Sequence, residues 1–155
     1  MSSTLLRTAG TVEVDSEAIY REEFLVPRDA VDANGHVNNV VYLRWMQDVA
    51  IRHSDAAGVT AAMQALDATW VVRSHHVEYL TPAFADDRIA VSTWVVHFRR
   101  VRSLRRYWFV NASTGKVLVR GETDWVFVDR ASGRPRSVPA DIMRRFPILT
   151  DDAGF

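Results

Sequence analysis

The sequence predicts an α+β fold in which one long helix packs against a curved antiparallel sheet. The stretch 39–57 is apolar over most of a helical surface, and its charged residues form a single stripe at three- and four-residue spacing. Segments after it are rich in Val, Trp, Tyr, Phe and Thr with alternating hydrophobic positions, as is typical of strands. We therefore expect the helix to be buried along most of its length, with the sheet wrapped around it.

The first elements can be read in chain order. A strand is expected over about 18–26, and a loop rich in Asp, Asn and Gly follows over 28–39. The long helix then begins at a cap from Asn38 or Asn39, and Gly58 can close its end. The stripe expected to face solvent consists of Arg44, Asp48, Arg52 and Asp55.

The remainder of the chain supplies the sheet. Four further strands are expected at about 68–80, 87–99, 104–111 and 116–129. Hairpin-type turns are expected at 111–115 and 131–133, and a short terminal helix over 139–146. We expect one domain over 1–155, with its core over about 16–147 and short flexible tails.

Composition excludes several classes of function. The 155 residues are 48% hydrophobic and 25% charged, and they contain no cysteine, which excludes thiol nucleophiles, iron–sulfur clusters and Cys-based zinc sites. The 19 basic residues balance the 19 acidic ones, so the chain has no net positive charge that would attract nucleic acid. No run approaches the roughly 20 apolar residues that span a bilayer, so we expect a cytoplasmic protein that binds no membrane.

The segment Asp32 to Asn39 reads D-A-N-G-H-V-N-N and continues through V-V to Tyr42. On these residues the chain resembles the hotdog-fold thioesterases of the 4-hydroxybenzoyl-CoA thioesterase-like superfamily, whose signature D-x-x-G-H-V-N-N-x-x-Y is matched in full. Residues 78–83, followed by the pair 86–87, resemble that family's next strand and turn. The resemblance implies a hotdog fold, hydrolysis of an acyl-CoA without cofactor or metal, and a site between the subunits of a homodimer or homotetramer.

The chemistry of thioester hydrolysis suits such a segment. The reaction needs a base or nucleophile beside the carbonyl carbon and donors aimed at the oxygen that gains charge. The first N–H groups of a helix are unpaired and lie at its positive end, so they can polarise a carbonyl. Gly35 lets the backbone approach the substrate closely. Asp32 would then activate a water molecule or attack the carbonyl itself.

The resemblance also implies roles for individual residues. Asp32 occupies the position of the catalytic carboxylate, and the N–H of Asn39 occupies the position that holds the substrate carbonyl. Gly35, Val37 and Tyr42 belong to the same signature and are expected to contact the substrate.

The spacing of Asp32, Asn34 and His36 is similar to the D-x-N-x-H triplet of the plant acyl-carrier-protein thioesterases. This implies that Asn34 and His36 also take part, and it keeps acyl carrier protein open as the substrate carrier. The plant enzymes add a catalytic glutamate near the next strand, where this chain has Pro82. Glu78, which lies earlier, is therefore only a secondary candidate.

The run from Arg99 to Arg106 is the strongest local charge feature. Arg102 and Arg105 are candidates to bind the phosphates of coenzyme A, because the arginine fork suits such groups. Two structural roles explain the run equally well. The arginines can keep an exposed junction between two strands soluble, or they can form a row of ion pairs at a subunit interface. His75 and His76 are adjacent on an expected strand and should point to opposite faces, so we expect no metal site there.

Two other functions fit the same fold. A hydratase or dehydratase acting on acyl thioesters would carry its Asp/His pair after a different helix, so the intact Asp32 loop favours hydrolysis. A non-catalytic module that binds acyl-CoA is the other alternative, because a fold does not imply turnover.

Overall fold

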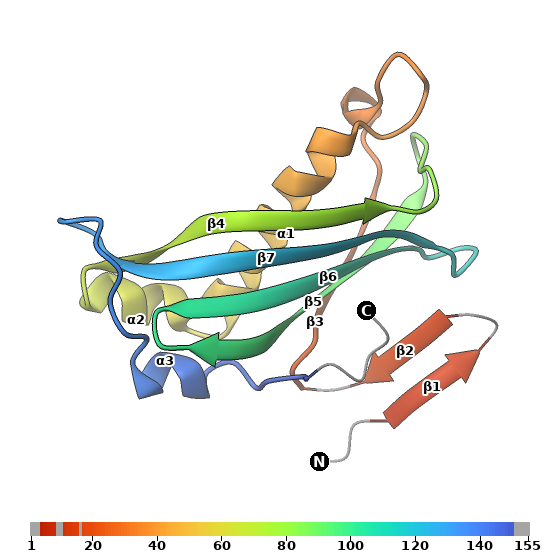
Figure 1. Ribbon diagram of the computed structural model, residues 1–155. Coiled ribbons are helices and arrows are strands. Elements are labelled where there is room, and N and C mark those ends of the chain that lie inside the picture. Colours follow the sequence, from red (N-terminus) through yellow and green to blue (C-terminus); the bar gives the residue numbers. More distant parts are fainter. Residues whose placement is uncertain (1–3, 9–10, 16, 151–155) are drawn as a thin grey trace.

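The computed structural model describes residues 4–8, 11–15 and 17–150, with side chains described over 17–150. The elements, shown in Figure 1, are β1 (Thr4–Thr8), β2 (Thr11–Asp15), β3 (Tyr20–Leu25), η1 (Arg28–Ala30), α1 (Asn39–Ala56), α2 (Val59–Ala65), β4 (Ala68–Tyr79), β5 (Arg88–Arg99), β6 (Arg102–Asn111), β7 (Val117–Asp129) and α3 (Ala140–Arg144). The predicted α+β class is confirmed, and each expected strand and helix is present with its ends shifted by at most three residues.

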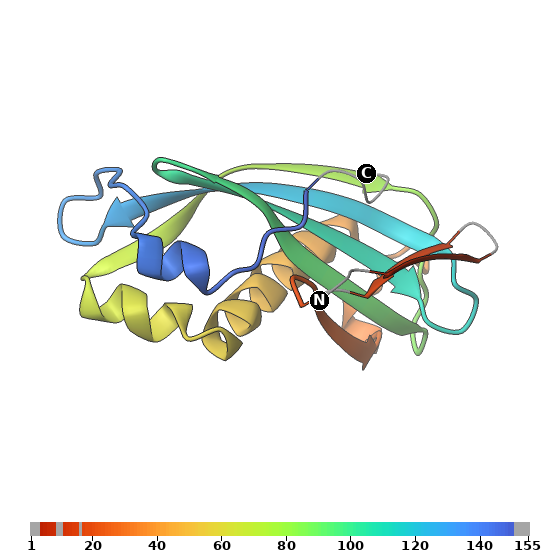
Figure 2. The same cartoon turned by 90° about the horizontal axis from the view of Figure 1, so that it is seen from below.

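The main sheet has five strands in the order β3-β5-β6-β7-β4, and every neighbouring pair is antiparallel. Helices α1, α2 and α3 all lie on one face of this curved sheet, as Figure 2 shows from below. Strand β4 is therefore an edge strand, with β7 as its one partner strand among the described residues.

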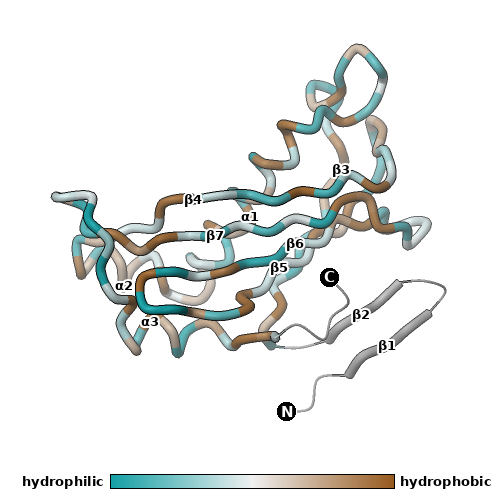
Figure 3. Tube along the Cα trace, in the orientation of Figure 1, coloured by the Kyte–Doolittle hydropathy of each residue, from teal (hydrophilic) through white to brown (hydrophobic). Residues whose placement is uncertain are grey.

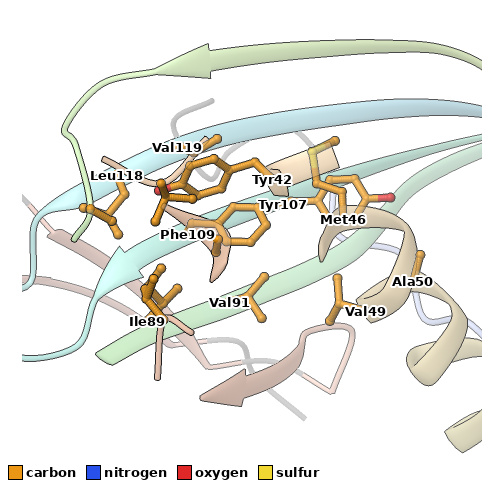
Figure 4. Packing of buried hydrophobic residues seen from close by; sticks show 14 residues of the cluster. Tyr42, Met46, Val49, Ala50, Ile89, Val91, Tyr107, Phe109, Leu118 and Val119 are labelled. Atoms are coloured by element: carbon orange, nitrogen blue, oxygen red, sulfur yellow. The ribbon is translucent and has the colours of Figure 1, made fainter. Parts of the chain in front are cut away.

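The largest part of the core lies between α1 and the sheet. Tyr42, Met46, Val49 and Ala50 project from successive turns of α1, as expected for positions three and four residues apart. They pack against Ile89 and Val91 of β5, Tyr107 and Phe109 of β6, and Leu118 and Val119 of β7 (Figure 4). Along the strands hydrophobic and hydrophilic positions interleave, as Figure 3 shows, because only one face meets α1.

Helix α1 is less buried than its composition suggests. Its predicted charged stripe does reach solvent, since Arg44, Arg52 and Asp55 are exposed and Asp48 is half-buried. However, Val40 and Ile51 are also exposed, at 67% and 54% of their surface. The expectation of burial along most of the helix was wrong at these positions, because a single sheet covers only one side of α1.

Two features were not predicted. Gly58 ends α1 in the expected left-handed conformation, but a second helix, α2, begins directly after it. Before β3, where a tail was expected, β1 and β2 pair as a two-stranded antiparallel sheet. Helix α2 and β1 are too short to carry a clear periodic pattern, and the alternation in β2 is confined to Val12 and Val14.

A polar belt crosses the core beside α1. It consists of the five buried polar residues among those described: His53, Thr93, Ser103, Arg105 and Thr123. One apolar cluster, described above, lies toward the start of α1, and a second one forms where α2 and α3 meet the sheet. Among the described residues, no helix is long and apolar enough to cross a membrane.

Candidate active site

The segment before α1 forms a tight loop that is closed by its own backbone. Val31 and Val37 form an antiparallel bridge, and the Asp32 N–H donates to the His36 carbonyl at 2.9 Å. The Gly35 N–H donates back to the Asp32 carbonyl at 3.0 Å, with Gly35 at a φ of +81°. Only glycine adopts this φ without strain, so Gly35 allows the loop to reverse direction.

Two further hydrogen bonds attach the loop to its surroundings. The Val37 N–H donates to the Ala83 carbonyl at 2.9 Å, and the Asn38 N–H donates to the Ala30 carbonyl at 2.9 Å. The loop is thus tied to η1 on one side and to the segment after β4 on the other. Its position relative to the sheet is fixed by backbone contacts rather than by flexible side chains.

Helix α1 begins at the end of this loop. Asn38 caps it, because its Oδ1 accepts from the Val40 N–H at 3.0 Å, so of the two predicted caps Asn38 is the one used. The Tyr79 hydroxyl donates to the Asn39 carbonyl at 2.9 Å and so ties β4 to the first turn. Within the described part of the chain, no acceptor is found for the Asn39 N–H. This donor remains at the positive end of the helix.

A pocket of about 240 Å³ lies beside the start of α1. Its lining includes the signature residues His36, Val37, Asn39 and Tyr42, together with Tyr79 and Pro82. The strand-to-turn segment that follows β4 therefore meets the loop and the helix at one place. Four of the residues expected from the sequence are brought together here.

Asp32 lies on the same loop, although neither it nor Asn34 is part of the pocket lining. The Asp32 side chain is half-buried, and its Oδ1 accepts from the Asn34 N–H at 2.9 Å. No described residue donates to the other carboxylate oxygen. Asn34 is exposed and contributes its backbone N–H, rather than its amide side chain, to this contact.

The aromatic residues around the pocket are closely packed. The His36 ring lies edge-on to Phe84, with 5.3 Å between ring centroids. Tyr42 is 2% exposed, and burial raises the pKa of its hydroxyl well above the usual range. That hydroxyl has no hydrogen-bond partner among the described residues. Tyr42 thus lines the pocket as a buried, neutral side chain whose hydroxyl group is unpaired among the described residues.

Other candidates lie elsewhere. Glu78 is exposed, and its carboxylate is 3.5 Å from His76 Nε2 on the sheet face opposite to α1. It therefore does not face the pocket. His75 lies on the helix-facing side, where its Nδ1 is 2.8 Å from Thr123 Oγ1. The adjacent histidines do point to opposite faces.

The arginine candidates are far from Asp32 within one chain. Arg102 pairs with Asp124 at 2.8 Å on the outer face of the sheet. Arg105 is 4% exposed and contacts His53 and Thr93 inside the core, so a surface phosphate does not reach it in this arrangement. Tyr79 and Arg102 pair with β7 at positions 119 and 126, which are roughly 23 Å apart along that strand.

Tyr79 is the site residue that sequence reasoning missed. It faces α1 because it alternates with Glu78 along β4, and its hydroxyl contacts the first residue of the helix. The alternation of β4 indicated a helix-facing side chain at this position. It did not show that the helix would begin beside it.

Comparison with known proteins places this site in a family context. A family model described as the thioesterase-like superfamily matches residues 25–146. The chain is 28% identical over 131 residues to the acyl-CoA thioester hydrolase YbgC of Escherichia coli, covering 83% of this chain and 96% of that protein. It is 26% identical over 138 residues to oleoyl-acyl carrier protein thioesterase 1 of Arabidopsis thaliana, a chloroplastic protein, covering 84% of this chain.

The plant relatives are longer than this chain, which spans about 37% of the length of the first ones it matches. Among solved structures, the 1,4-dihydroxy-2-naphthoyl-CoA thioesterase of Synechocystis superposes with a TM-score of 0.75 at 15% identity, covering 83% of this chain and 95% of that one. At this identity the likeness concerns the fold alone. It confirms the predicted hotdog architecture.

Proposed function

Because the chain belongs to the thioesterase-like superfamily, we propose that it hydrolyses an acyl thioester to a free acid and a thiol, with Asp32 carrying the chemistry. The observation that carries the proposal is the junction of the Asp32 loop, the start of α1 and the 240 Å³ pocket. The loop supplies a carboxylate, and the helix that follows it supplies an unpaired N–H; these are the two kinds of group that thioester hydrolysis requires. We also propose that residues 1–155 form one domain of this fold.

In the proposed mechanism the thioester carbonyl lies against the first turn of α1. The Asn39 N–H and the helix dipole stabilise the charge that develops on its oxygen. In one route Asp32 removes a proton from the water that attacks the carbonyl carbon and passes this proton to the leaving thiolate. In the other route Asp32 attacks the carbonyl carbon itself, which releases the thiolate to be protonated by solvent, and a water molecule then hydrolyses the resulting mixed anhydride to the free acid and Asp32. The Asn34 N–H keeps the carboxylate in place by its hydrogen bond to Oδ1. Gly35, Val37, Tyr42 and His36 then contact the acyl part.

Tyr79 fits this mechanism as a positioning residue. Its hydroxyl donates to the carbonyl of Asn39, the residue whose N–H would bind the substrate oxygen. That contact holds the first peptide of the helix against β4. A shift of the peptide would misalign the N–H from the substrate carbonyl.

A thiol-release assay against a panel of acyl-CoA esters tests the proposal. We expect turnover of at least one ester, and loss of that turnover when Asp32 is replaced by Asn. If no ester is hydrolysed but several bind, the chain is a binding module instead. If products of addition across a double bond are formed without release of thiol, the chain is a hydratase.

The carrier of the acyl group is a separate part of the proposal. The curated relatives include proteins named for acyl-CoA and for acyl carrier protein. We propose CoA as the carrier for this chain, because its match to the acyl-CoA thioester hydrolase YbgC covers 96% of that protein. Arg102 is our candidate for a CoA phosphate contact. Arg102→Gln should raise KM for an acyl-CoA and leave KM for the matching pantetheine ester nearly unchanged. Equal losses on both esters would assign Arg102 to structure.

We also propose that the protein is a homodimer or homotetramer. The outer edge of β4 has no partner strand among the described residues, and a 12-residue edge is a ready template for pairing. Exposed apolar residues lie along this edge and the neighbouring side of α1: Val40, Ile51, Val71 and Tyr79. If two copies paired antiparallel through β4, the Arg102 end of one sheet would approach the Asp32 end of the other.

The mass of the protein in solution tests this assembly. Light scattering at micromolar concentration should give at least twice the 17.6 kDa of one chain. Replacing Val71 by Lys, which places a charge on the edge strand, should shift the protein toward the monomer. A monomeric wild-type protein would remove the basis for a site shared between subunits.

A further inference from the structure

Arg105 is the charged member of the polar belt, and it is held without a counter-ion. Its Nη1 donates to His53 Nδ1 at 2.8 Å and to Thr93 Oγ1 at 3.0 Å. Its guanidinium carbon lies 5.2 Å from the centroid of the Phe146 ring. Within residues 17–150 no carboxylate is within ion-pair distance of it. A buried charge without a counter-ion is costly to a fold, so this arrangement needs an explanation.

The contacts of Arg105 do not supply the missing negative charge. Burial and the neighbouring guanidinium lower the pKa of His53 to about 3, so its ring is neutral and its Nδ1 accepts the hydrogen bond from Arg105. The nearest carboxylates on β7 face the other side of the sheet. There Glu122 pairs with Arg106 at 3.0 Å, and Asp124 pairs with Arg102. The guanidinium therefore remains available to an anion.

Arg105 also lines a second pocket, with a volume of about 500 Å³, between α1, α2 and β4. Its walls are largely apolar and include Ala50, Met63, Trp70 and Phe146. The indole N–H of Trp70 is buried and has no acceptor among the described residues. A volume of this size and walls of this kind are typical of small-molecule sites. The indole N–H of Trp125, also on the lining, is equally buried without an acceptor, and the Arg105 guanidinium has no acidic partner among the described residues.

The second pocket is separate from the one at the start of α1. The two have no lining residue in common. Between them Met46 packs on Gly121 so closely that a Cβ at position 121 would lie 2.8 Å from the Met46 sulfur. A ligand of the second pocket therefore does not need to pass the Asp32 loop.

We propose that this second pocket binds a carboxylate carried on an apolar body, with the carboxylate paired to the Arg105 guanidinium. The planar fork of arginine matches the two oxygens of a carboxylate, and Arg105 is already oriented by His53 and Thr93. The apolar body lies against Trp70 and Phe146. Within one chain the site lies apart from the Asp32 loop, and binding there does not depend on hydrolysis at Asp32. Its lining residues Ile51 and Val71 adjoin the β4 edge proposed above for pairing.

Isothermal titration calorimetry with octanoate tests the site, with octanamide as the neutral ligand of the same length. Octanoate should bind with one site per chain, and octanamide roughly tenfold to a hundredfold more weakly, since the charged pair is lost. Arg105→Met, which keeps an apolar side chain in the core, should weaken octanoate by a similar factor. The control Arg106→Met removes the neighbouring charge on the outer face and should leave octanoate binding intact.

A second variant covers the case in which Arg105→Met does not fold. Ser54 is half-buried in the wall of the pocket, and Ser54→Phe should fill the pocket while Arg105 stays in place. Octanoate binding should then be lost, with an unchanged circular dichroism spectrum. Binding that survives Ser54→Phe, equal binding of octanamide, or no binding of octanoate to the wild type would overturn the proposal.

Discussion

The Asp32 loop and the polar belt both lie along α1, but they are built from different kinds of contact. In the loop, the decisive hydrogen bonds join backbone atoms of residues close in sequence, such as the Asp32 N–H and the His36 carbonyl. In the belt, Arg105 of β6 meets His53 of α1 and Thr93 of β5 through side chains. A local backbone site is specified by a short motif, whereas the belt exists only once the sheet has closed on the helix.

Asp32→Asn should produce the largest effect and should be confined to the loop. We expect kcat for the best thioester to fall about a hundredfold or more, because the variant lacks the basicity that either mechanism requires. Binding of octanoate in the second pocket should not change. Asn34→Ala is the matched control and should lose less, because Asn34 holds Asp32 through its backbone N–H. Near-normal turnover by Asp32→Asn would move the chemistry to another residue.

His53→Leu should produce the largest loss of stability in the belt. The change removes one acceptor from a buried guanidinium, and we expect a loss of about 1–3 kcal/mol in the free energy of unfolding measured with urea. In an Arg105→Met background the same change should cost much less, because no charge is left to satisfy. Equal costs in both backgrounds would show that the two residues do not interact.

The same pair predicts a dependence of stability on pH. His53 has a pKa of about 3 in the folded protein, against 6.5 for the free side chain, so between these values the unfolded chain binds a proton that the folded chain does not. The stability that neutral His53 contributes is complete above pH 6.5 and falls as the pH is lowered toward 3. The groups that face His53 are Arg105, Tyr20 and Phe146.

Urea unfolding at several pH values measures this effect. The wild type should lose stability more steeply between pH 6.5 and pH 4 than His53→Leu does, and carboxylates elsewhere contribute equally to both curves. Parallel curves would mean that His53 does not titrate as its burial implies. The Asp32 loop should have no part in the difference.

Asn38→Ala should have the smallest effect, and it concerns the loop. The change removes the cap on the Val40 N–H and should lower the free energy of unfolding by about 1 kcal/mol. A modest fall in kcat should accompany it, since the first turn of α1 holds the proposed carbonyl site. If thermal unfolding is unchanged while kcat falls, the cap acts on the site alone.

Most of the fold could be predicted because its elements carry strong local patterns. The long strands alternate hydrophobic positions, and α1 has a continuous apolar surface between an asparagine cap and Gly58. Helix α2 was missed because its seven residues follow the predicted stop without a pattern of their own. The exposure of Val40 and Ile51 could not be predicted, because it depends on whether other elements cover the side of α1 that faces away from the sheet.

The candidate site was predicted only in part, and for a related reason. The signature from Asp32 to Tyr42 is contiguous, so its position before the helix followed from the sequence. Tyr79 reaches the same place from a distant strand, and its contact with Asn39 required the three-dimensional register. Arg105 shows the opposite outcome: the sequence indicated a local run of arginines, but strand alternation turns Arg105 toward the core while Arg102 and Arg106 face outward.

The strand order has a consequence for how the chain folds as it is synthesised. Strand β3 pairs with β5, where Leu25 lies opposite Arg88, and β4 pairs with β7, where Ala68 lies opposite Asp129. The partners of both early strands thus leave the ribosome long after them, and the central strands are made last. Such non-local pairing slows folding and leaves strand edges exposed meanwhile. We expect β4 of the nascent chain to remain without its partner strand until β7 is complete, whereas β3, β5 and β6 can pair before then.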